Sequence, residues 1–151
     1  MEKIDRVVKR ITLGCLLFSL TFFSSCAPDL TDDAIPYVQF TNIIINVSTH
    51  PSLQLDGGYE YIGGGVRGII LYRKNGSTYI AYERNSSFHP NEACATVDVD
   101  ISGLFIIDTC SNSTFSLSNG NPTSGPAITP LRRYVVQLNA FELTITDDIA
   151  N

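Results

Sequence analysis

The sequence predicts an all-β fold, a small antiparallel sandwich or barrel, for the chain beyond its first 34 residues. Short runs rich in β-branched and apolar residues recur there about every ten residues, with Gly, Pro, Asn and Ser between them. Tight-turn dipeptides such as Asn-Gly join neighbouring runs, which is typical of β-hairpins. No stretch of this region has a helical period of useful length. These three observations together exclude an α/β or helical domain.

The expected strands follow from these runs. Asn75-Gly76 joins two runs as a hairpin, and Asn139-Ala140 joins the last two. Asp98 and Asp100 alternate with apolar residues, as in a half-exposed strand. The runs expected to be strands are 38–47, 69–73, 77–82, 96–99, 104–107, 134–138 and 142–145.

Composition and charge limit the function classes. The chain has 151 residues, 44% of them hydrophobic and 17% charged, which is enough to form one packed domain and excludes wholesale disorder. Its formal net charge is −5, so nucleic acid is not an expected partner. The glycine cluster 63–65 lacks the Gly-Lys-Ser/Thr of a phosphate loop, and we expect turns there.

The amino-terminal segment has the form of an export signal. Four basic residues (Lys3, Arg6, Lys9 and Arg10) precede an uncharged stretch over 11–23, which is too short to span a membrane. Phe23-Ser24-Ser25-Cys26 resembles a bacterial lipobox, with Phe23 in place of the usual Leu. We therefore expect residues 1–25 to be a lipoprotein signal peptide that is removed, and Cys26 to be acylated. An ordinary signal peptide with a free Cys26 is the alternative.

Residues 26–34 form an acidic tether between this anchor and the domain over 35–147. From Cys26 onward there are six basic and thirteen acidic residues, a formal net charge of −7. Membrane attachment is then expected from the acyl chains on Cys26 and not from a basic patch. The predicted location is the bacterial envelope, with the outer membrane favoured, and the sequence identifies no protein partner.

Three segments of the expected domain resemble the Rieske [2Fe–2S] family, of the type found in exported proteins of Bacteroidetes-like bacteria. They are 81–90, 107–115 and 120–134, and the last holds Gly125-Pro126-Ala127 followed by Pro130-Leu131. The resemblance covers most of the chain after the tether. It implies a Rieske-like small antiparallel β-sandwich or barrel with two loops at a cluster-type tip.

Members of that family hold the cluster with Cys-x-His in one loop and Cys-x-x-His in the other. With Phe115 fixing the register, these four positions fall on Ser87, His89, Asp108 and Ser111, so only His89 keeps a ligand type. Sliding Cys110 into a ligand position still leaves Ser at 87 and 113. Hydroxyl and carboxylate oxygens are poor ligands for a sulfide cluster. We therefore expect no cofactor and no metal, with a [2Fe–2S] cluster as the alternative.

The resemblance also implies a disulfide between Cys94 and Cys110, which corresponds to the bridge between the two loops in respiratory members. A zinc site from these two cysteines with His50 and His89 is an alternative, although no pair has finger-like spacing. Ser87, Asp108 and His89 are the residue types of a hydrolase triad. No nucleophile elbow or oxyanion motif accompanies them, so we do not expect a hydrolase.

These patterns predict a lipid-anchored envelope protein with a structural or interaction role, and no enzyme is expected. The alternative from the family is an electron carrier associated with oxidoreductases, with a non-standard ligand set. A third possibility is a small-ligand or glycan binder that uses exposed tyrosines, although core and rim positions are the more usual role for such residues. The tyrosines concerned are Tyr59, Tyr61, Tyr72, Tyr79 and Tyr82.

Overall fold

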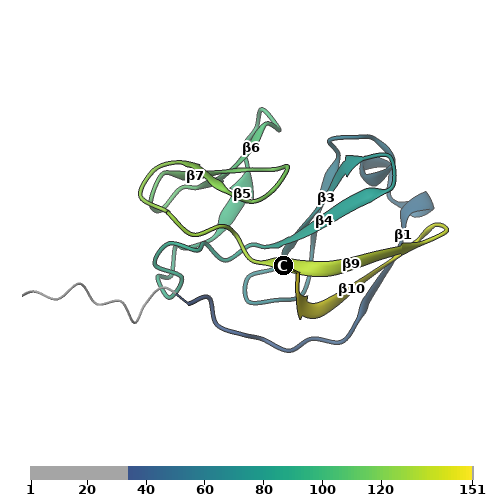
Figure 1. The fold of residues 1–151 in the computed structure, drawn as a ribbon, viewed down its shortest axis with the longest axis horizontal. Helices are drawn as coiled ribbons and strands as arrows, with labels where there is room; N and C mark the ends of the chain where they lie inside the picture. Colours follow the sequence, from purple (N-terminus) through teal and green to yellow (C-terminus); the bar gives the residue numbers. More distant parts are fainter. Residues whose placement is uncertain (1–33, 151) are drawn as a thin grey trace, which may run out of the picture. The chain divides into compact units, whose positions relative to one another are not determined.

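A computed structural model of the chain describes residues 34–150. Within them, ten strands form two antiparallel sheets, and two short 3-10 helices lie between β1 and β2 (Figure 1). The elements are β1 (Ile43–Asn46), η3 (Val47–Thr49), η4 (Pro51–Gln54), β2 (Tyr59–Ile62), β3 (Ile69–Asn75), β4 (Thr78–Glu83), β5 (Val97–Val99), β6 (Phe105–Asp108), β7 (Ser113–Ser116), β8 (Pro122–Ser124), β9 (Arg133–Asn139) and β10 (Glu142–Ile149). The all-β prediction is confirmed.

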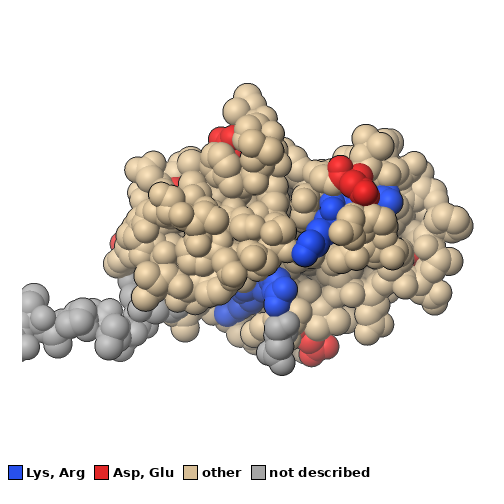
Figure 2. Space-filling view, turned by 45° about the horizontal axis from the view of Figure 1, so that its top comes forward, with Lys and Arg blue, Asp and Glu red and all other residues tan. Residues whose placement is uncertain are grey.

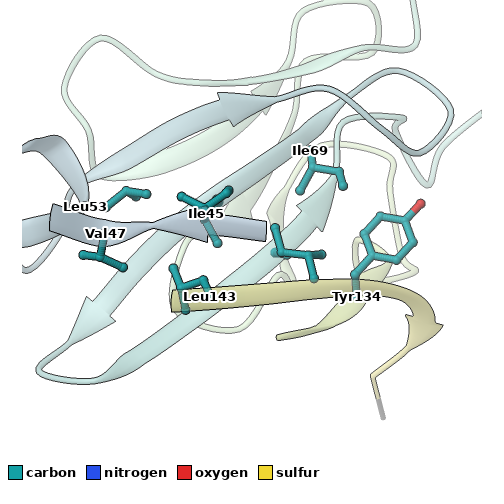
Figure 3. Packing of buried hydrophobic residues seen from close by; sticks show 9 residues of the cluster. Ile45, Val47, Leu53, Ile69, Tyr134 and Leu143 are labelled. Carbon is teal, nitrogen blue, oxygen red and sulfur yellow. The ribbon is translucent and has the colours of Figure 1, made fainter. Parts of the chain in front are cut away.

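The larger sheet has six strands in the order β1-β10-β9-β4-β3-β2, and the smaller has four in the order β5-β6-β7-β8. The six-stranded sheet curls so that residues from both of its halves share one core, the inner core. Figure 3 shows side chains of this core pointing toward one another from β1, β3, β9 and β10. Its fully buried members include Leu53, Ile69, Leu143 and Ile145.

Successive side chains of β3 and β4 point to opposite faces of the six-stranded sheet, and both faces are buried there. Ile69 and Leu71 belong to the inner core, whereas Ile70 between them packs with Val97 and Phe115 of the four-stranded sheet. Successive side chains of a strand point to opposite faces, so a run of apolar residues without polar gaps fits a strand buried on both sides. We call this second cluster the inter-sheet core.

Both predicted hairpins are present. Asn75 pairs with Thr78, so the turn residues are Gly76, at φ +46°, and Ser77, one position later than expected. In the last hairpin Asn139 pairs with Glu142, so the turn residues are Ala140 and Phe141, one position later than expected.

The expected strand over 38–47 is wrong for most of its length, because only Ile43–Asn46 joins the ladder. Phe40 instead packs its ring edge-on against Tyr134, with the ring centroids 5.1 Å apart. Val47 already lies in η3, which begins where the Asn46 side chain accepts a hydrogen bond from the Ser48 N–H. The strands β2, β7 and β8 were not expected. At the other end, β10 continues to Ile149, past residue 147.

Candidate functional site

Three loops of the described chain come together at one end of the four-stranded sheet. The first runs over 84–96 between β4 and β5, the second over 109–112 between β6 and β7, and the third over 125–132 between β8 and β9. They correspond to the three segments on which the family resemblance rests. We call the three loops the tip.

The centre of the tip is the Asp108 side chain, at the end of β6, which is fully buried. One of its carboxylate oxygens accepts hydrogen bonds of 2.7 Å from the hydroxyls of Ser86 and Ser111. The other accepts a 2.9 Å bond from the Cys110 N–H. Three donors from two loops thus compensate the burial of this carboxylate, which would otherwise be costly.

The hydrogen-bonded network continues from Asp108 into the third loop. The Ser111 hydroxyl lies 2.8 Å from that of Ser113, which is fully buried. The Ser113 hydroxyl in turn accepts a 3.1 Å bond from the Ala127 N–H. Gly125 passes so close that a Cβ there would lie 2.5 Å from the Ser113 Cα. Hydroxyls and backbone therefore fill the space between the second and third loops.

A disulfide joins Cys94 in the first loop to Cys110 in the second, and this predicted pair is confirmed. The two Cα atoms are 5.5 Å apart, a usual separation for a bridge. Both cysteines lie at the exposed side of the tip. The bridge and the Asp108 network hold the same two loops from outside and from inside.

The arginine at position 67 holds the first loop to the sheet. Its guanidinium donates to the carbonyls of Glu92 at 2.6 Å and Ala93 at 2.7 Å, and also bonds the Asn85 side-chain oxygen. The planar guanidinium has several N–H donors in fixed directions, so it can bond several fixed acceptors at once. These bonds position the backbone just before Cys94.

The base of the first loop is held by Glu83, a second fully buried carboxylate. It accepts hydrogen bonds from the backbone N–H groups of Val66 (2.8 Å), Arg67 (3.0 Å) and Asn85 (3.0 Å), and a 2.6 Å bond from the Tyr134 hydroxyl. Burial and this bond to a carboxylate raise the pKa of Tyr134. Glu83 thereby ties the 64–67 loop to both β4 and β9.

The four positions that correspond to cluster ligands do not converge. Asp108 and Ser111 are in contact, but the Ser87 hydroxyl donates to the Thr129 carbonyl at 2.6 Å. His89 is exposed, has a left-handed φ of +44°, and packs its ring against Phe88. The first-loop residue that reaches Asp108 is Ser86, next to the one expected.

No family model and no curated protein match the chain. Among solved structures, it is similar to a chain in the complex of reduced oxygenase and oxidized ferredoxin of carbazole 1,9a-dioxygenase, at 17% identity and a TM-score of 0.50 over 72% of this chain and 97% of that one. The fold is Rieske-like. The ferredoxin of carbazole 1,9a-dioxygenase from Nocardioides aromaticivorans matches at 17% identity and a TM-score of 0.47, over 71% of this chain and 98% of that one. At this identity the likeness concerns the fold.

The residues of this Rieske-like tip do not fit a [2Fe–2S] cluster. Such a cluster needs thiolate and imidazole donors, whereas Cys94 and Cys110 are consumed in the disulfide and His89 is the single imidazole near the loops. The buried Asp108 carboxylate, at a position where the family has a cysteine thiolate, already accepts three hydrogen bonds from the protein. The donor set is that of a closed hydrogen-bonded network.

The structure does not bring together the residues of the zinc alternative, of a Ser-His-Asp triad or of a tyrosine platform. Within residues 34–150 no group of three or more His, Cys, Asp or Glu side chains is arranged to hold a metal ion, and His50 of the zinc alternative lies 2.5 Å from Glu60. The Ser87 hydroxyl donates to the Thr129 carbonyl, as a nucleophile in such a triad would not. Tyr82 is fully buried and bonds the Leu117 carbonyl, so the five tyrosines share no exposed platform.

The signal peptide over 1–25, the anchor at Cys26 and most of the tether over 26–34 lie outside the described residues. Over 34–150, no helix is long and apolar enough to cross a membrane. The residues that sequence reasoning missed are Arg67, Glu83, Ser86 and Ser113. Ser86 and Ser113 lie one and two residues from predicted positions, and a wider window around those positions would have included them.

Proposed function

We propose that the protein is a lipid-anchored cell-envelope protein whose Rieske-like domain binds no cluster and has a structural or interaction role. The observation that carries this proposal is the buried Asp108 carboxylate with its three hydrogen-bond donors. Such a side chain stabilises the two loops directly, in the place where the family uses a cluster. The disulfide adds a second link and leaves the outer surface of the loops available for contact.

Export and anchoring rest on the amino-terminal pattern. A basic start, an uncharged stretch over 11–23 and a Cys after two serines favour lipoprotein processing at Cys26. Export also fits the disulfide, because such bonds persist in oxidising compartments. The proposed location is the bacterial envelope, with the outer membrane as the first expectation.

The cluster is tested on the full chain purified aerobically in a neutral detergent, beside a Rieske ferredoxin treated in the same way. We expect no stoichiometric iron and no visible cluster absorption from this protein, and both from the ferredoxin. Stoichiometric iron with a cluster spectrum would overturn the proposal in favour of the alternative, an electron carrier with a non-standard ligand set.

The anchor is tested by incorporation of labelled palmitate in a bacterial host. Cys26→Ser should abolish labelling and release the protein from membranes, whereas Cys15→Ser should leave both unchanged. Separation of inner and outer membranes gives the location. Labelling of the Cys26→Ser variant, or its retention in membranes, would reject the anchor without bearing on the cluster.

A further inference from the structure

The basic residues of the domain differ in whether they have partners. Six lie within residues 34–150, and four of them are engaged. Arg67 and Arg132 donate to backbone carbonyls, and Arg73 and Arg84 pair with aspartates. The side chains of Lys74 and Arg133 have neither a hydrogen bond nor an ion pair anywhere in the described part of the chain. They are its two unengaged cations.

Both unengaged cations line one cleft of about 440 Å³. The cleft lies where β4 and β9 diverge: their register ends at Ala81 and Tyr134, although β4 begins at Thr78 and β9 continues to Asn139. Figure 1 shows the two strands separating beyond that point. Its volume is within the range of ligand-binding clefts. We call it the β4–β9 cleft.

The charge of this cleft is opposite to that of the domain. The chain from Cys26 onward has a formal net charge of −7, yet the cleft lining holds Lys74 and Arg133 and no acidic residue. Figure 2 shows basic side chains across the middle of one face, with an acidic group against them at the upper right. A concave surface of one sign concentrates ligands of the opposite sign, so the β4–β9 cleft favours an anion.

The spacing of the cations defines the kind of anion. Arg133 pairs with Tyr82, which pairs with Ile70, four residues before Lys74 in β3. Two strand spacings and four residues of rise place the two Cα atoms roughly 16 Å apart. One small anion cannot contact both side chains at such a separation unless both bend inward. A ligand with two separated negative groups fits better.

The remaining lining fits a peptide. Ile80, Val135 and Val136 supply aliphatic surface, and Thr78, Ser118 and Asn119 supply hydroxyl and amide groups. The two aromatic residues of the lining offer no open stacking face for a sugar. The Tyr79 ring packs against the inner core and has the Arg73 guanidinium over it, 5.8 Å from the ring centroid, and Tyr134 is buried.

We propose that the β4–β9 cleft binds an extended acidic peptide segment of a partner protein, with two carboxylates four residues apart and an apolar side chain at the position midway between them. Residues i and i+4 of an extended peptide point to the same side and lie about 13 Å apart, close to the spacing of Lys74 and Arg133. The site lies on the six-stranded sheet and the turn after β7, and it does not depend on what the tip binds.

The test is calorimetric titration of the full chain, in neutral detergent at low salt, with the peptide acetyl-Glu-Thr-Val-Thr-Glu-amide, whose central Val lies on the same side as the two Glu side chains. Lys74→Gln and Arg133→Gln should each weaken binding about tenfold, because each removes one charge-assisted contact. Gln39→Glu makes the same change in net charge at an exposed residue that does not line the cleft, and it should leave Kd within about twofold. The corresponding Gln peptide should not bind measurably.

Two further ligands test whether the cleft prefers a peptide to a small anion or an acidic sugar. A small dicarboxylate, glutarate, and a trimer of galacturonic acid are titrated in parallel, and both should bind more weakly than the peptide. The proposal is overturned if the peptide does not bind, if Lys74→Gln and Arg133→Gln bind it as the wild type does, or if either further ligand binds more tightly.

Discussion

The Ser86 hydroxyl donates a 2.7 Å hydrogen bond to the Asp108 carboxylate in the interior of the tip, where neither side chain is exposed to solvent. The bond joins the loop after β4 to the end of β6, so it links the six-stranded sheet to the four-stranded sheet. By the family resemblance, Asp108 lies where a cluster ligand would be. A side-chain contact thus makes the loop-to-loop connection that the cluster makes in the family.

Replacement of Asp108 by Ala should lower the free energy of unfolding by about 2–4 kcal/mol. The change removes three hydrogen bonds to a charged acceptor and leaves the hydroxyls of Ser86 and Ser111 without it. Urea unfolding of the oxidised protein measures the effect. Glu142→Ala, at an exposed position of β10, should change the same quantity by less than about 0.5 kcal/mol. Equal effects of the two variants would show that the network does not stabilise the fold.

Reduction of the Cys94–Cys110 bridge should destabilise the domain by roughly 3 kcal/mol, because the bridge closes a loop with a sequence separation of 16. The double variant Cys94→Ala, Cys110→Ala should be that much less stable and should not respond to reductant. Mass spectrometry of non-reduced peptides should find the two cysteines joined. Free thiols in exported protein would contradict the prediction.

The strands that sequence predicted are those whose own residues favour a strand. The runs 69–73, 77–82 and 134–138 are rich in β-branched and aromatic residues and reappear in β3, β4 and β9. In contrast, β7 (Ser113–Ser116) and β8 (Pro122–Ser124) are mostly Ser, Thr and Pro. They are strands because β6 pairs with β7 and β7 with β8, which is a tertiary interaction that local propensity does not contain.

The contacts of the tip likewise fall into those that the sequence indicated and those that it did not. The disulfide that the family resemblance implied is present. Asp108 and Ser111, which the resemblance assigns to ligand positions, contact each other. Ser86 was missed because one residue along an irregular loop changes where a side chain points, and Ser87 points to the third loop. The Arg67 contacts were missed because they join segments 25 and 26 residues apart without a local motif.

Gly65→Ala should be among the most destabilising single changes in the domain, at about 2–5 kcal/mol. Gly65 has φ +62°, and a Cβ there would lie 2.2 Å from the Glu83 carboxylate oxygen and 2.9 Å from the Tyr134 hydroxyl. The backbone strain and the overpacking add to each other.

Gly63→Ala is the matched control for this change, since a Cβ at Gly63 meets nothing within 4 Å. It should alter stability by less than about 1 kcal/mol. Urea unfolding compares the two variants. A Gly65→Ala variant as stable as Gly63→Ala would show that the Glu83 site tolerates displacement.

The stabilising effect of Tyr82 should be lost at alkaline pH. Burial raises the pKa of this phenol above its ordinary value of 10.0, so the folded state retains a proton that the unfolded state releases. Its contribution is therefore fully present below pH 10.0 and declines as the pH rises above that value. At neutral pH, Tyr82→Phe should cost about 1 kcal/mol, because it removes the hydrogen bond to the Leu117 carbonyl.

Phe has no such proton, so the difference in stability between wild type and Tyr82→Phe should narrow by about 1 kcal/mol between pH 10 and pH 11. Urea unfolding of both proteins at pH 7, 9, 10 and 11 measures this difference. Other titrating groups, Lys74 and Tyr134 among them, are present in both proteins and cancel in the comparison. A difference that stays constant over the whole series would mean that the Tyr82 phenol ionises equally well in the folded and unfolded chain, and that its burial in the inter-sheet core does not disfavour the phenolate.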